Sequence, residues 1–99
     1  MSSSLPQFRT ATVVTASPAQ VGATGARRLM AVSIAGGSAA SKVEFKNAAT
    51  DTGTVLLTVN CLTNDNRFVD LTELGGIMFD TAIFCKPAGT GAIVYVWYE

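Results

Sequence analysis

The chain has 99 residues, with seven basic and seven acidic side chains that cancel to a formal net charge of zero. This length fits one domain, and a hydrophobic fraction of 48% is typical of a globular chain rather than a disordered one. Charged residues are only 14% of the chain and histidine is absent, which argues against nucleic acid as a partner and excludes histidine-based triads and zinc sites. We therefore expect no metal and no cofactor.

Short β-branched or apolar runs follow one another along the chain, separated by turn-forming residues. No stretch longer than one or two helical turns shows the 3.6-residue spacing of apolar residues that is typical of a helix, and no internal repeat is present. The pattern predicts an all-β protein, an antiparallel β-sandwich or jelly roll of about seven to eight short strands. The expected strands are residues 9–15, 28–35, 42–46, 54–61, 67–71, 77–79, 82–85 and 92–98.

Two of these runs indicate which side chains are buried. Val43 and Phe45 alternate with charged residues, so we expect them to face the core while their neighbours face water. Residues 67–71 are expected to be anchored by Phe68 or Val69 together with Leu71. In the run 28–35 the better core candidates share one face, which consists of Met30, Val32 and Ile34.

The last strand is apolar on both faces. Such a strand is usually central in its sheet or covered by a second chain. We therefore expect it to contribute an interface between copies of the chain, formed by Val94, Val96, Trp97 and Tyr98.

Aromatic residues near the C-terminal half also offer a stacking surface for a sugar or a base. Burial in the core or in a subunit interface is the favoured interpretation, because aromatic side chains dominate both settings. The candidates are Phe79, Phe84, Tyr95, Trp97 and Tyr98. They keep open a second function, a tail or fibre accessory module that binds a receptor or glycan.

The tripeptide Asp51-Thr52-Gly53 matches the signature of aspartic proteases, in which two carboxylates share a proton across a two-fold axis. The retroviral type is a dimer of subunits near this length. In that family a hydrophobic strand leads directly into the aspartate, whereas residues 47–50 here read Asn-Ala-Ala-Thr. Aspartate and glycine also favour turns, so we interpret the tripeptide as a hairpin turn. A dimeric protease stays as a remote alternative, and no enzymatic activity is expected.

The two cysteines are expected to be small buried hydrophobic residues. Residues 1–8 have neither the basic region nor the apolar region of a signal peptide, and no run is long and apolar enough to cross a membrane. We therefore expect synthesis in a cytoplasm, where thiols stay reduced, and no membrane partner. Whether Cys61 and Cys85 pair stays open, since pairing requires that their strands be neighbours.

Three segments resemble a loose group of small structural proteins of tailed bacteriophages, including phages of cyanobacteria. They are GTVLLT at 53–58, LGGIMFDT at 74–81 and the terminal strand 93–98. The group comprises capsid decoration (cement) proteins and related head-fibre or tail accessory β-sandwich modules. Cys61, Cys85 and Trp97 are not part of its pattern.

The resemblance implies a virion structural protein made in the host cytoplasm and placed on the capsid surface. It implies a homo-oligomer, most often a trimer, seated where subunits of the major capsid protein meet. Residues 1–8 are expected to form a flexible N-terminal arm that precedes a single sandwich domain of residues 9–99. The arm is expected to contact the capsid through Leu5, Pro6 and Phe8.

Overall fold

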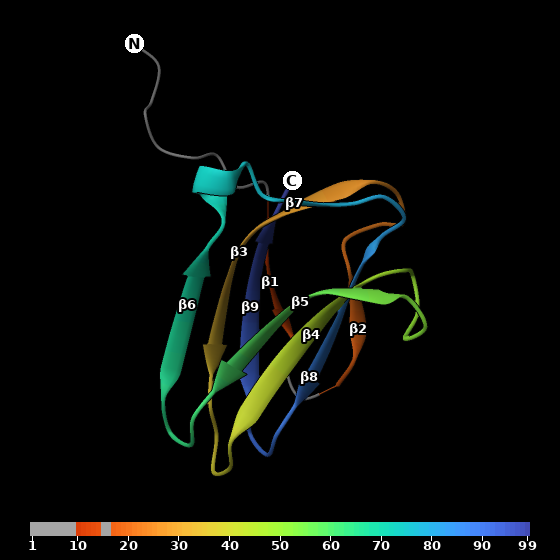
Figure 1. Cartoon of the computed structure of the whole chain (residues 1–99). Coiled ribbons are helices and arrows are strands. Elements are labelled where there is room, and N and C mark those ends of the chain that lie inside the picture. Colours follow the sequence, from red (N-terminus) through yellow and green to blue (C-terminus); the bar gives the residue numbers. More distant parts are fainter. Residues whose placement is uncertain (1–9, 15–16) are drawn as a thin grey trace.

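The computed structural model describes residues 10–14 and 17–99, and within them the chain forms nine strands and one short 3-10 helix (Figure 1). The all-β prediction is confirmed. No helix in this part of the chain is long and apolar enough to span a membrane. The elements are β1 (Thr10–Val14), β2 (Ala19–Val21), β3 (Arg27–Ala35), β4 (Ser41–Asn47), β5 (Thr54–Cys61), β6 (Asn66–Asp70), η1 (Thr72–Leu74), β7 (Ile77–Phe79), β8 (Ile83–Ala88) and β9 (Ile93–Tyr98).

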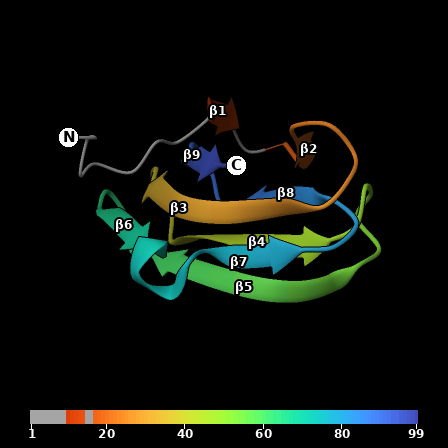
Figure 2. The ribbon, with the colours of Figure 1, turned by 90° about the horizontal axis from the view of Figure 1, so that it is seen from above.

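The strands form two antiparallel sheets (Figures 1 and 2). The first sheet has the order β1-β9-β3-β6, with β7 also paired to β3, and the second has the order β2-β8-β4-β5. The pairs β1–β9, β2–β8, β3–β6 and β4–β5 are nested in the sequence, and all are antiparallel. This is the arrangement of a long hairpin rolled into two sheets. Of the two architectures left open by the sequence, the topology is therefore that of a jelly roll.

The core lies between the two sheets. Val43 and Phe45 on β4 are fully buried, as their alternation with charged residues predicts. They pack in one cluster with side chains from both sheets, because each sheet turns one apolar face inward. The other fully buried members of this cluster are Val21, Leu29, Val32, Ile34, Phe79, Ile83, Cys85, Val94 and Val96.

The inward face of β3 changes along the strand. The register between β3 and β9 shifts between Leu29 and Ala31, and an irregularity of this kind breaks the two-residue alternation. Val32 and Ile34 belong to the core cluster as predicted, but before the shift the cluster contains Leu29. Met30 is buried outside that cluster, with its sulfur close to Gly76.

The structure has one strand more than the eight expected from the sequence, and the additional strand is β2. It is three residues long and follows Pro18, which the pattern treats as a break. It nevertheless pairs with β8 and buries Val21 completely. Three residues are too few to display a period, so this strand depends on its neighbour rather than on its own pattern.

Three loops meet closely at one end of the sandwich, and two glycines allow it. Gly36 donates its N–H to the Asp65 carbonyl at 2.7 Å, while the Gly37 carbonyl accepts from the Asn64 N–H at 2.9 Å. A Cβ atom added to Gly37 would lie 2.0 Å from the Thr90 carbonyl oxygen. The close packing fixes the β3–β4, β5–β6 and β8–β9 loops relative to one another.

The two cysteines are buried and free. Cys61 is on β5 and Cys85 is on β8, and β4 lies between these strands. Cys85 pairs with Phe45 whereas Cys61 pairs with Ser41, four positions away along β4. The strands are therefore not neighbours, and a disulfide between the two residues does not fit this fold.

Both thiols are expected to be unreactive in the folded protein. Burial raises the pKa of Cys85 to about 12, which suppresses the reactive thiolate, and Cys61 donates its S–H to the Asp65 carbonyl at 3.1 Å. A thiol reagent at pH 8 should titrate almost no thiol in the native state and two per chain in denaturant. Fast titration of one thiol per native chain would contradict these positions.

Candidate functional site

An aromatic cluster covers the outer face of the first sheet. Tyr95 and Trp97 are two residues apart on β9 and share one side of it, with ring centroids 6.5 Å apart and ring planes 25° apart. Phe68 on β6 meets the Trp97 ring edge-on, at 6.0 Å and 79°. Ile93 continues the same side of β9. We call Phe68, Ile93, Tyr95 and Trp97 the aromatic face.

The strand between these side chains contributes small residues. On β3, Ala31 lies opposite Trp97 of β9. Ser33 lies between Tyr95 of β9 and Phe68 of β6, because β3 pairs with both strands. No bulky β3 side chain separates the aromatic rings of β9 from the ring of β6, so these rings meet above the strand. Phe68 is 59% exposed, Tyr95 is 39% exposed, and Trp97 is half-buried. The aromatic face thus exposes apolar surface at Phe68, Ile93 and Tyr95.

The predicted interface residues divide between the two faces of β9. Val94 and Val96 are fully buried in the core of the single chain, and Tyr98 is 8% exposed. The Tyr98 ring is covered by the Arg27 guanidinium, whose central carbon lies 5.6 Å from the ring centroid. Only Trp97 of the four predicted residues lies on the outward side, so a contact between copies through β9 would use the aromatic face.

The other predicted functional residues are distributed as follows. Phe79 is fully buried and Phe84 is 9% exposed, so neither offers an open stacking surface. The predicted capsid-contact residues Leu5, Pro6 and Phe8 lie outside the described residues.

The sequence leaves open whether Phe68 or Val69 faces the core together with Leu71, which is buried there. The structure turns Phe68 outward and leaves Val69 partly buried against the core. The flanking Arg67 and Asp70 do not distinguish these two registers. Pairing of Phe68 with Ser33 places the ring on the outer face, and only the assembled sheet contains that information.

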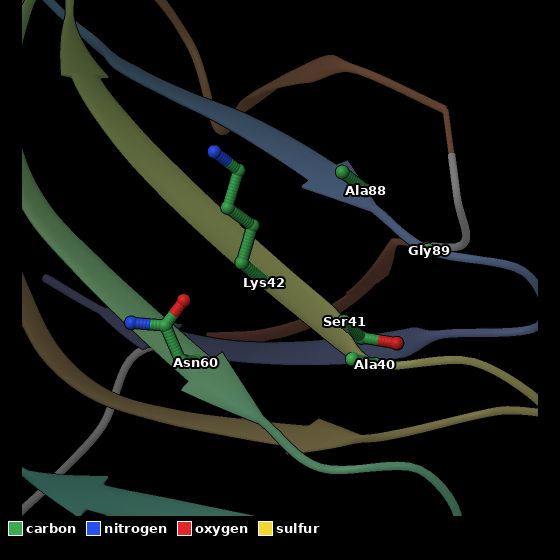
Figure 3. A pocket seen from close by; sticks show the side chains of 6 residues that line it. All are labelled: Ala40, Ser41, Lys42, Asn60, Ala88 and Gly89. Atoms are coloured by element: carbon green, nitrogen blue, oxygen red, sulfur yellow. The ribbon is translucent and has the colours of Figure 1, made fainter.

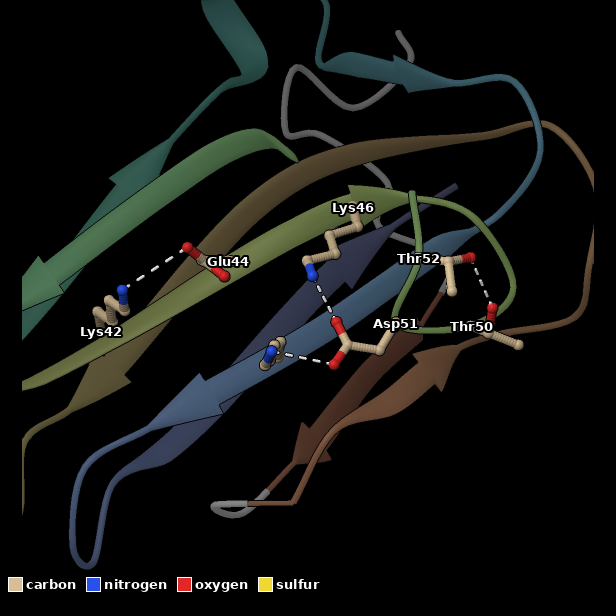
Figure 4. A network of polar contacts seen from close by, with 7 residues as sticks. Lys42, Glu44, Lys46, Thr50, Asp51 and Thr52 are labelled. Carbon is tan, nitrogen blue, oxygen red and sulfur yellow. Dashed lines mark hydrogen bonds and ion pairs between the residues drawn. The ribbon is translucent and has the colours of Figure 1, made fainter. Parts of the chain in front are cut away.

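The outer face of the second sheet is charged. The turn between β4 and β5 brings Asp51 against two lysines: Lys46 Nζ lies 2.5 Å from Oδ1 and Lys86 Nζ lies 3.0 Å from Oδ2 (Figure 4). Lys42 and Glu44 form a looser pair at 3.7 Å on the same face. This surface is therefore hydrated and contrasts with the aromatic face on the other sheet.

The charge of Asp51 also bears on the protease alternative. Hydrogen bonds from Lys46, the larger cause, and from Lys86 hold the pKa of the Asp51 carboxyl below its ordinary value. The hydrogen bond to Asp51 in turn raises the pKa of Lys86. An aspartic protease needs a carboxylate pair that shares a proton, whereas two ammonium groups favour the fully ionised form. Asp51 lies in a turn, as its sequence context predicts, and its carboxylate holds the turn against the sheet.

This ion pair makes a testable contribution to the pH dependence of stability. Because the folded pKa of Asp51 is below the ordinary 3.8, its stabilisation is present above pH 3.8 and lost as the pH falls through the lower folded value. Asp51→Asn should therefore have a slightly lower urea midpoint than wild type at pH 7, and the difference should narrow below pH 3.8. A difference that stays constant from pH 7 to pH 2 would contradict the pairing.

Two shallow depressions lie at the end of the second sheet, with volumes of about 270 and 230 Å³, and Figure 3 shows the first of them. Both are lined by Ala40, Ser41 and Asn60, and the Ser41 hydroxyl already donates to the Ala39 carbonyl at 3.0 Å. They bring together no pair of acidic and basic side chains suited to proton transfer. Across residues 10–14 and 17–99, no group of three potential metal ligands comes together.

Comparison with known proteins gives little resemblance in sequence. No family model matches the chain, and no curated protein matches it. Among solved structures, the coat protein of Tobacco streak virus is similar over 95% of this chain and 90% of that chain, with 13% identity and a TM-score of 0.35. A TM-score of this size does not establish a common fold.

Proposed function

We propose that the chain is a virion structural protein, an oligomeric capsid decoration (cement) module that stabilises a phage head by binding the major capsid protein. The observation that carries the proposal is the aromatic face. Soluble monomers rarely expose contiguous large apolar side chains, and aromatic residues are enriched where proteins bind proteins. The jelly-roll topology adds support by analogy, because this architecture recurs in viral capsid domains.

The aromatic face is assigned to contact between copies of the chain. A chain of 99 residues has a small core, and burying Phe68 and Tyr95 against another copy would add apolar contact that the single chain lacks. We take a trimer as the favoured assembly, following the resemblance described above. The charged face of the second sheet, with its Asp51 ion pairs, would then stay in water on the outside of the assembly.

The contact with the major capsid protein is assigned to the N-terminal arm, through Leu5, Pro6 and Phe8. β1, which the arm precedes in the sequence, begins at Thr10, opposite Tyr98 at the end of β9. An oligomer would present several arms from one body and gain affinity from multivalent attachment. Such a module strengthens a shell by bridging its subunits and requires no catalytic residue.

Binding to particles tests this proposal. The full chain should co-sediment with capsids of the virus that encodes it and saturate at a fixed number per capsid. A chain that begins at residue 9 should lose most of this binding, and Tyr95→Ser should weaken it by lowering the valency. Leu74→Ser, which changes an exposed leucine of η1 that does not belong to the aromatic face, is the matched control. Unchanged binding without residues 1–8 would overturn the role of the arm, and no binding by the full chain would overturn the function.

A second candidate is a tail or fibre accessory module that binds a glycan. It is favoured by the Tyr95 ring, which is 39% exposed on the outer side of β9 and lies beside Trp97 at an interplanar angle of 25°. A glycan array should then give defined hits that Trp97→Ala removes. An array without hits for the wild type would eliminate this candidate.

A further inference from the structure

Phe84 is a buried aromatic side chain that does not belong to the core between the sheets. It is 9% exposed, yet it is not a member of the core cluster, whereas its neighbours Ile83 and Cys85 are. Because side chains alternate along a strand, Phe84 points to the outer face of the second sheet. That face is the charged one, so another part of the chain must cover this ring.

The turn between β4 and β5, residues 48–53, lies over this position. Lys46 of β4 is opposite Phe84, and Lys86 follows Phe84 by two positions on β8, on the same face. The Asp51 carboxylate contacts the ammonium groups of both lysines, at 2.5 and 3.0 Å (Figure 4). Asp51 reaches both because the turn folds back across the outer face, over the Phe84 ring.

The Lys46 side chain contributes to the same cover. It is only 13% exposed, although it carries a charge on the outer face of a sheet. A lysine stem of four methylene groups can lie along apolar surface while its ammonium group reaches a charged partner. The stem of Lys46 and the turn together thus enclose the Phe84 ring, and the Asp51 carboxylate closes the enclosure from above.

This turn has few attachments to the rest of the molecule. Its backbone hydrogen bonds are local, as in the one from the Thr52 N–H to the Thr50 carbonyl at 2.8 Å. Within the part of the chain that the structure describes, the contact of Asp51 with Lys86 is the only ion pair or hydrogen bond between the turn and a strand outside its own hairpin. A segment held in this way can open locally while the rest of the domain stays folded.

We propose that residues 48–53 form a strap that closes over Phe84, is held closed by Asp51, and opens as a local unit when the Asp51 ion pairs are weakened. The closed state presents a charged, hydrated face, whereas the open state exposes an aromatic ring flanked by two lysines. Salt screens partly exposed ion pairs and therefore shifts the strap toward the open state. The device goes beyond the proposed function, because it changes the face of the second sheet and leaves the aromatic face as it is.

Limited proteolysis with elastase, which cleaves after small residues, tests the opening of the strap. Cleavage after Ala48 or Ala49 requires the strap to leave the sheet, and the masses of the two fragments identify these sites. Asp51→Asn should raise the rate of this cleavage about fivefold, and salt at about 1 M should raise the wild-type rate in the same direction. Glu44→Gln is the matched control, because it breaks the neighbouring pair with Lys42 on the same face and should keep the wild-type rate.

Two results of this experiment would overturn the proposal. One is an equal cleavage rate for Asp51→Asn and Glu44→Gln. The other is an increase in Asp51→Asn that affects sites throughout the sandwich equally, because that pattern reports unfolding of the whole domain rather than local opening.

A thiol at position 84 tests the cover itself. Phe84→Cys adds a third thiol to a chain whose two native cysteines are buried, and this thiol should react slowly with a thiol reagent at pH 8. Adding Asp51→Asn should accelerate the reaction about fivefold, while unreactive Cys61 and Cys85 show that the sandwich stays folded. Immediate reaction at position 84 with Asp51 intact would overturn the proposal. If all three thiols react at once, the variant is unfolded and the proteolysis experiment decides.

Discussion

Phe45→Ala should lower the free energy of unfolding by about 4 kcal/mol, the largest single effect expected in this protein. Phe45 is fully buried at the centre of the core, on β4, with β5 on one side and β8 on the other. Truncation removes most of an aromatic side chain and leaves a cavity that two rigid sheets cannot close. A domain of this size has a total stability of only about 5–15 kcal/mol, so the loss is a large share of it.

The urea midpoint at a fixed protein concentration measures this effect. Leu74→Ala is the control, because it truncates an apolar side chain that is 75% exposed and does not belong to the aromatic face. It should cost less than about 1 kcal/mol. Equal losses for the two variants would contradict the placement of Phe45 inside the sandwich.

Gly37→Ala should lower the free energy of unfolding by about 3 kcal/mol. The added Cβ would lie 2.0 Å from the Thr90 carbonyl oxygen and 2.7 Å from the Gly91 carbonyl carbon. Both are backbone atoms, which cannot rotate away as the end of a side chain can. The β3–β4 and β8–β9 loops would have to separate, and the hydrogen bond from the Ser38 N–H to the Thr90 carbonyl, 3.1 Å long, would be strained.

Ser38→Ala is the control for this position. Ser38 is adjacent and exposed, and the substitution keeps its backbone N–H, so the stability should change by less than about 0.5 kcal/mol. Thermal or urea unfolding of the two variants measures the difference. If Gly37→Ala is as stable as Ser38→Ala, the three loops do not pack as closely as described.

The sequence predicts those parts of the fold in which one strand carries its own signal. β4 alternates charged and apolar residues, so its inward face follows from the two-residue period. β9 is apolar on both faces, and its pattern does not distinguish the core side from the outer side. Pairing of β9 with both β1 and β3 makes it central, and only that assembly assigns Val94 and Val96 to the core.

The jelly-roll order and the aromatic face depend on contacts that are distant in sequence. Phe68 and Trp97 are 29 positions apart, and they meet because β6 and β9 both pair with β3. No local period encodes that meeting. The small β3 residues Ala31 and Ser33 are equally uninformative before their neighbours are known.

The aromatic face is proposed as a contact between copies, and the native mass of the dilute protein tests this contact most directly. Light scattering after size exclusion should give a defined multiple of 10.3 kDa for the wild type, three being the favoured value. Tyr95→Ser and Phe68→Ser should reduce it to one chain, while Leu74→Ser should leave it unchanged. A wild type that elutes as a single chain of 10.3 kDa, with a mass unaffected by any of these substitutions, would contradict the account.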